Sequence, residues 1–82
     1  MYNIFLIINS NDTYNRGLKT LYGNFCTVID WYNDMSARTT YLQLGYPNVG
    51  VLPCMVNMDT KQVIQNVTDF NSALVEIDAV IK

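Results

Sequence analysis

Histidine is absent from this sequence, and cysteine and charged residues are scarce. Without histidine the chain cannot build a Ser-His or Cys-His nucleophile pair or a histidine-ligated metal site. Its two cysteines, Cys26 and Cys54, form no CxxC pair and are too few for a four-cysteine zinc site. We therefore expect no metal and no cofactor, and enzymes that depend on histidine chemistry are excluded.

The shortage of charge excludes further classes of function. Charged residues make up 15% of the chain, against roughly 25% in typical soluble domains. The five basic residues are scattered and the net charge is −2, so we expect no nucleic-acid partner. The N-terminus lacks a basic segment, and the apolar run Ile4 to Ile8 is too short for a signal sequence or a membrane span. We expect a cytoplasmic protein that does not bind membranes.

Uncharged polar and aromatic residues take the place of the missing charge. The chain has ten asparagines and six tyrosines, and tyrosine is enriched in protein contacts. We expect asparagines such as Asn3 to cover the surface, and part of that surface to be occluded in an assembly. The alternative is a soluble domain that is merely low in charge. Tyr32, Tyr41 and Tyr46 either form an aromatic contact surface or complete the core, whereas Trp31 is expected in the core.

Four segments have the composition of strands. Residues 2–9 carry apolar side chains on both alternating faces, which predicts a central strand with helices on both sides of its sheet. Residues 25–31 are β-branched and aromatic and predict a second strand. Residues 54–58 and 61–67 flank the Asp59-Thr60 turn and predict a hairpin.

Three amphipathic segments predict helices, each preceded by side chains that can cap it. The first follows residues 10–12 and ends near Gly23, and the third follows Thr68 or Asp69. The second covers roughly 35–44, with Asn33, Asp34 and Ser36 as its cap candidates. The expected core-facing residues are, in chain order, Tyr14, Leu18, Leu21, Tyr22, Ala37, Tyr41, Leu44, Phe70, Ala73, Leu74, Ile77 and Ile81. The order β-α-β-α-β-β-α over residues 1–82 predicts one α/β domain with a four-stranded mixed sheet, its first two strands parallel.

Two stretches of the chain resemble the glutaredoxin branch of the thioredoxin-fold family. Residues 44–56 (LGYPNVGVLPCMV) are similar to the end of the family's second helix, its loop and the proline that begins its third strand. This match implies a cis bond before Pro53. Residues 65–70 (QNVTDF) are similar to the turn into the family's last helix. The family also has this order of elements and nearly this length, so the resemblance covers nearly the whole chain and implies a thioredoxin-like fold.

The catalytic and glutathione-binding motifs of that family have no counterpart here. The positions that match its CPYC-type motif are about 13–16, and a threonine hydroxyl cannot replace a thiolate in disulfide exchange. At the glutathione-binding turn, Asn66-Val67 stands where the family has Gly-Gly, and these side chains obstruct a ligand that lies against the backbone. The resemblance therefore implies a member that is not an enzyme.

Cys54 needs separate consideration, because in this fold it follows the proline beside the vacated active site. It could be a lone reactive thiol. The other residues of its strand are apolar, however, and a cysteine buried in apolar surroundings has a raised pKa and is inert. We expect a structural role for Cys54 and for Cys26.

These observations favour a redox-inactive thioredoxin-fold protein that binds a protein partner or copies of itself. Besides the three tyrosines, the expected contact surface is the face that matches the family's active site, formed by Thr13, Tyr14, Asn15, Arg16, Leu52, Pro53, Asn66 and Asp69. A phage or viral particle assembled in the cytoplasm is the expected setting, on the basis of analogy and composition. Two alternatives stay open: a degenerate or single-thiol oxidoreductase, and a small inhibitor of a host protein.

Overall fold

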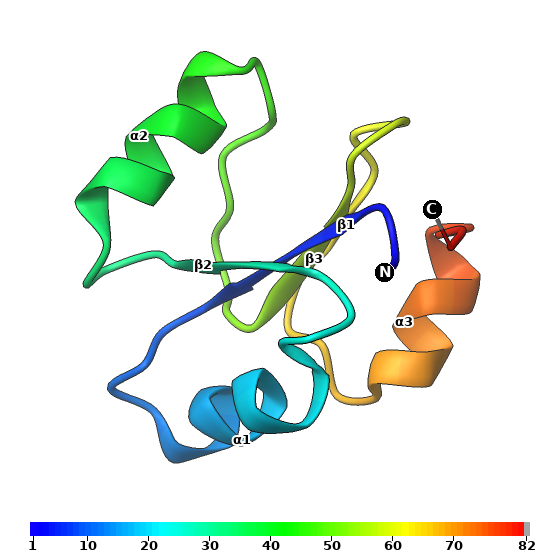
Figure 1. Cartoon of the computed structure of the whole chain (residues 1–82), viewed down its shortest axis with the longest axis horizontal. Coiled ribbons are helices and arrows are strands. Elements are labelled where there is room, and N and C mark those ends of the chain that lie inside the picture. Colours follow the sequence, from blue (N-terminus) through cyan, green and yellow to red (C-terminus); the bar gives the residue numbers. More distant parts are fainter. Residues whose placement is uncertain (82) are drawn as a thin grey trace.

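A computed structural model describes residues 1–81, which form a four-stranded mixed sheet with three helices (Figure 1). The elements are β1 Ile4–Ile8, α1 Thr13–Tyr22, β2 Thr27–Asp30, α2 Met35–Gln43, β3 Cys54–Asn57, β4 Val63–Ile64 and α3 Phe70–Glu76. The strands lie in the order β2-β1-β3-β4, with β1 parallel to β2 and antiparallel to β3, and β4 antiparallel to β3. The predicted α/β class and element order are confirmed. Over residues 1–81, no helix has both the length and the hydropathy needed to cross a bilayer.

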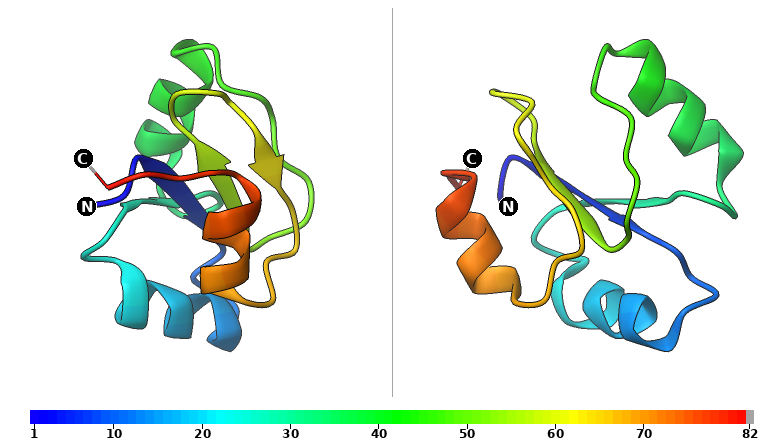
Figure 2. Two further views of the ribbon diagram at one scale, coloured as in Figure 1. Left: turned by 90° about the vertical axis from the view of Figure 1, so that its right-hand side faces the viewer. Right: turned by 180° about the vertical axis from the view of Figure 1, so that it is seen from behind.

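β1 is the centre of the fold because both of its faces are covered. All five of its residues are buried. Ile4, Leu6 and Ile8 pack with residues of α1 and α3, whereas Phe5 and Ile7 pack with residues of β2 and α2. Figure 2 shows α1 and α3 on one side of the sheet and α2 on the other. The continuous apolar pattern of this strand therefore predicted its two-sided burial correctly.

An aromatic cluster fills the face of the sheet beneath α2. The ring of Tyr41 meets those of Phe5 and Trp31 edge to face, at centroid distances of 5.2 and 5.6 Å. Tyr41 is 1% exposed, and its hydroxyl donates a hydrogen bond to the backbone carbonyl of Pro47. The prediction of a contact surface is therefore wrong for Tyr41, because α2 has no other fully buried side chain with which to cover the sheet. Tyr46 completes the cluster and is only partly exposed.

Each helix begins at an aspartate. Asp12, Asp34 and Asp69 have non-helical backbone angles, and each carboxylate accepts a hydrogen bond from a backbone N–H in the first turn of its helix. All three aspartates were among the capping residues expected from the sequence. Such a cap satisfies one of the backbone donors that a helix start leaves without an intrahelical partner.

The buried stripe of α1 is narrower than predicted. Within this helix only Asn15 and Leu18 are buried, while Leu21 is 66% exposed and Tyr14 is 49% exposed. The prediction that Tyr14 and Leu21 face the core is wrong, because the polar Asn15 occupies the helix position that faces the sheet. Leu44, which caps the C-terminus of α2, is likewise exposed rather than part of the core.

The hairpin after Pro53 is present, but its second strand is short. Val63 and Ile64 pair with Val56 and Met55, and no other residue of the predicted segment 61–67 joins the ladder. At one end of this segment Lys61 has φ 64°, and at the other Asn66 has φ 55°. A left-handed residue breaks the extended path of a strand, so pairing is confined to the residues between them.

The last helix also ends earlier than predicted. α3 stops at Glu76, and Asp78 with φ 52° turns the chain back toward the N-terminus. Ile81, predicted on the helix's apolar face, lies outside the helix, is 70% exposed and forms a bridge with Tyr2. The two ends of the chain therefore lie side by side (Figure 1).

A buried polar cluster stabilises this meeting of the chain ends. Asn3, expected on the surface, is buried, and its side-chain oxygen accepts a hydrogen bond from the backbone N–H of Val80 at 2.8 Å. Its amide contacts the side chains of Asn57 and Asp59. Asn57 donates in turn to the carbonyl of Ile77 at 2.8 Å. The surface prediction is wrong for Asn3 because these partners satisfy its amide inside the fold.

The loop before β3 runs beside the turn before α3. The backbone N–H groups of Asn66 and Val67 donate to the carbonyls of Val51 and Pro53, at 3.2 and 2.8 Å. The Leu52–Pro53 bond is cis, as the resemblance implied. These contacts bring two loops far apart in the sequence to the same end of the sheet.

Candidate functional site

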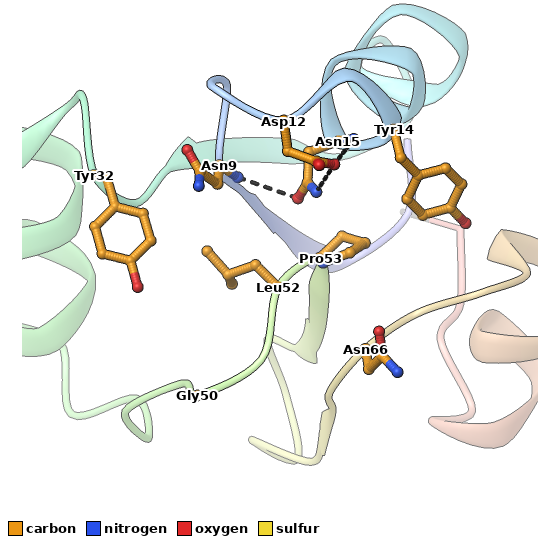
Figure 3. A pocket seen from close by; sticks show the side chains of 9 residues that line it. All are labelled: Asn9, Asp12, Tyr14, Asn15, Tyr32, Gly50, Leu52, Pro53 and Asn66. Carbon is orange, nitrogen blue, oxygen red and sulfur yellow. Dashed lines mark hydrogen bonds between the residues drawn. The ribbon is translucent and has the colours of Figure 1, made fainter.

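A network of polar side chains holds the loop between β1 and α1 (Figure 3). The Asp12 carboxylate accepts hydrogen bonds from the backbone N–H and the side-chain amide of Asn15, at 3.0 and 2.7 Å. The side-chain oxygen of Asn15 accepts from the backbone N–H of Asn9 at 3.1 Å. Because Asn15 is 4% exposed, this network fixes the start of α1 against the end of β1.

A second contact ties α1 to the turn before α3. The Tyr14 hydroxyl donates to the backbone carbonyls of Val67 and Thr68, at 3.2 and 3.1 Å. Leu52 and Pro53 lie opposite the start of the helix, between it and that turn (Figure 3). Three segments from distant parts of the chain thus surround one space.

That space is an open cleft of about 430 Å³. Its lining residues are Asn9, Asp12, Tyr14, Asn15, Tyr32, Gly50, Leu52, Pro53 and Asn66. Six of these belong to the contact surface expected from the sequence, namely Tyr14, Asn15, Tyr32, Leu52, Pro53 and Asn66. The fold therefore gathers most of the expected face around one cleft.

The other predicted contact residues do not line the cleft. Thr13 and Arg16 are exposed, and the Arg16 guanidinium donates to the carbonyl of Ser10 at 3.1 Å and to the Thr13 hydroxyl at 3.4 Å. Asp69 caps α3. The two tyrosines of the aromatic cluster pack on the α2 face of the sheet. These residues serve the helix ends and the core.

Three lining residues were not predicted as contact residues. Asn9 directly follows the buried strand β1, Asp12 was expected only as a helix cap, and Gly50 lies in the loop before β3. The signal for Asn9 and Asp12 was available, since polar residues just after a buried strand lie at the end of the sheet where ligand sites form. Nothing in the sequence around Gly50 pointed to a site.

Asp12 is the only charged side chain among the nine that line the cleft. Hydrogen bonds from the Asn15 side chain and from the Asn15 backbone lower the pKa of this carboxyl, and burial opposes them. The group is therefore ionised at neutral pH. The remaining lining groups are amides, phenols and apolar side chains, so the cleft is polar and weakly negative.

Both cysteines are buried away from this surface. Cys54 is fully buried, and burial raises the pKa of its thiol to about 12. Burial also raises the pKa of Cys26, to about 11. A thiol must ionise to act as a nucleophile. Neither sulfur is therefore placed or charged for disulfide exchange at neutral pH.

The Tyr14 hydroxyl makes a testable contribution to this site. Replacing Tyr14 by phenylalanine is expected to lower the free energy of unfolding by about 1 kcal/mol, because two backbone carbonyls lose a shared donor. Urea unfolding measures the change. Tyr32→Phe is the control. Because Tyr32 is 54% exposed, loss of its hydroxyl should change the free energy of unfolding little. Equal stability of the Tyr14 variant and the original chain would contradict the contact.

The side chains that line the cleft offer amides, phenols and one carboxylate. No thiol lines the cleft, and residues 1–81 contain no group of three histidine, cysteine, aspartate or glutamate residues that could hold a metal ion. Amide side chains both donate and accept hydrogen bonds, which suits recognition of polar groups. Comparisons with protein-family models, curated proteins and solved structures found no match.

Proposed function

We propose that this protein is a redox-inactive, thioredoxin-like module that binds a segment of a protein partner in the cleft. The element order and the position of Pro53 opposite the start of α1 support the thioredoxin-like assignment. In the family that the chain resembles, a redox cysteine lies at that helix start. Here Tyr14 and Asn15 occupy it, and Asn15 is engaged by Asp12 and Asn9.

The observation that carries the proposal is an open cleft at the helix start without a sulfur atom on its surface. The cleft has the size of a ligand site, since such sites span roughly 300–1,000 Å³. Cys54 lies close in sequence to the cleft wall but is fully buried. These facts count against the single-thiol oxidoreductase and favour binding without chemistry.

The lining favours a protein segment over a small apolar ligand. Leu52 and Pro53 supply an apolar floor, and Tyr14 and Tyr32 stand at its sides (Figure 3). The side-chain amides of Asn9 and Asn66, which are not buried, can pair with peptide N–H and C=O groups. Tyrosine is enriched at protein interfaces because it offers a large rigid ring and a polar end.

The scarcity of charged residues also suggests the kind of assembly in which this protein acts. A chain with few charges and many asparagines and tyrosines suits a subunit of a larger assembly, and a phage or viral particle assembled in the cytoplasm is the setting we propose. The segment in the cleft then comes from a neighbouring protein or from another copy of this chain.

A peptide selection tests the binding function. The intact protein is used to select binders from a randomised peptide library displayed on yeast, and the selected peptides are titrated into ¹⁵N-labelled protein. We expect the side-chain amide signals of Asn9, Asn15 and Asn66 to shift, because all three line the cleft.

A pair of variants makes this test specific to the cleft. Tyr32→Ala removes one wall and is expected to weaken binding about tenfold, in the range for an aromatic interface residue. Phe25→Ala is the control, since Phe25 is also about half exposed but does not line the cleft. An absence of binders, or shifts confined to residues outside the cleft, would refute the proposal.

A further inference from the structure

We propose that the cleft recognises a basic side chain, lysine or arginine, in the segment that it binds. This inference rests on the proposed function, since it names the chemistry of the partner at the same site. It draws on the charge of the lining residues, the hydrogen-bonding capacity of Asp12 and the shape of the cleft walls.

The lining of the cleft carries a single charge, and that charge is negative. Asp12 is the only ionised group among the lining residues, since a carboxyl group with an ordinary or lowered pKa is negative at neutral pH. Arg16 is the cation that lowers this pKa through its charge, but its guanidinium is held by Ser10 and Thr13 and does not line the cleft. No cationic side chain lines the cleft beside Asp12, so a cation that enters meets the carboxylate at short range.

The Asp12 carboxylate retains capacity for a ligand. Both hydrogen bonds from Asn15 go to one oxygen, Oδ2. A carboxylate offers about four acceptor positions over its two oxygens, so Oδ1 can accept from an ammonium or guanidinium group. Charge-assisted hydrogen bonds of this kind are about twice as strong as neutral ones.

The apolar and aromatic residues of the cleft can contact the uncharged stem of a lysine or arginine side chain. Leu52 and Pro53 form an apolar floor on which the methylene stem of lysine or arginine can lie. Tyr14 and Tyr32 stand on opposite sides of this floor (Figure 3), and a tyrosine ring attracts a cation over its face. An acidic side chain would be repelled by Asp12, and a purely apolar one would gain nothing from its charge.

The test uses the peptides selected on the intact protein. We expect them to share a lysine or arginine at one position, and replacement of that residue by norleucine to weaken binding about tenfold or more. Asp12→Asn is expected to cause a similar loss and to remove most of the salt dependence of binding. Asparagine caps a helix as well as aspartate does, so α1 is retained in this variant.

The matched control is Asp34→Asn. Like Asp12, Asp34 caps its helix by accepting from the backbone N–H three residues further on, that of Ala37, but it does not line the cleft. Its replacement should leave peptide affinity unchanged. Peptides that shift the cleft amides without a shared basic residue, or that bind the Asp12→Asn variant equally well, would overturn this inference and leave the binding function intact. Failure to obtain any peptide that shifts the cleft amides would overturn both.

Discussion

Replacing Asn57 by leucine is expected to lower the free energy of unfolding by about 3 kcal/mol, since each buried polar group left unpaired costs about 1–3 kcal/mol. Asn57 is 1% exposed. Its amide donates to the carbonyl of Ile77, and its oxygen accepts from the N–H groups of Asp59 and Thr60 at 2.8 and 3.1 Å. Leucine has a similar volume but satisfies none of these groups. Native domains have only about 5–15 kcal/mol of stability, so the loss expected from this one substitution is a large fraction of the total.

Urea unfolding followed by circular dichroism measures the effect. The matched control is Asn24→Leu, which introduces the same side chain at an exposed asparagine and should change stability by less than about 0.5 kcal/mol. If the two variants lose equal stability, the buried network does not hold the chain ends together in solution. A loss specific to Asn57 supports a structural role for the buried asparagines.

The second large expected effect concerns the thiols. At neutral pH, Cys54 in the folded protein should react with Ellman's reagent about a thousandfold or more slowly than in the unfolded chain, because only the thiolate reacts. Burial raises the pKa of Cys54 to about 12 and that of Cys26 to about 11. Each also lies out of reach of the reagent, since both thiols are buried.

Single variants assign the reaction to each sulfur. Cys26→Ser leaves only Cys54 to be measured, Cys54→Ser leaves only Cys26, and each remaining thiol should react fully after unfolding in urea. A fast reaction of Cys54 in the folded Cys26→Ser variant would contradict the redox-inactive proposal. It would restore the single-thiol oxidoreductase as the better hypothesis for this protein.

The two sets of polar residues in this fold have different roles. Asn3 and Asn57 lie where the chain ends meet and satisfy backbone groups there, so their replacement should act on stability. Tyr32 and Asp12 face the cleft, so their replacement should act on binding. Measuring stability and peptide affinity on all variants separates the two roles.

Local patterns in the sequence were sufficient for most of the fold. The continuous apolar run of β1 predicted a strand covered on both faces, and the aspartates at 12, 34 and 69 were among the expected caps. These features depend on neighbours a few residues away, which is why periodicity and capping chemistry can reveal them. The lack of a thiol at the start of α1 was equally predictable, because it depends only on which residues occupy those positions.

Only the tertiary structure decided which polar and aromatic side chains are buried and which face the cleft. Asn3, Asn15 and Asn57 are buried and Tyr32 is exposed, although composition suggested an asparagine-covered surface. The cleft itself joins residues as far apart as Asn9 and Asn66. Burial of an amide depends on hydrogen-bond partners that distant segments supply, and no local pattern contains those partners. The sequence alone thus determined what chemistry is missing, and the packing of distant segments determined what the remaining surface can bind.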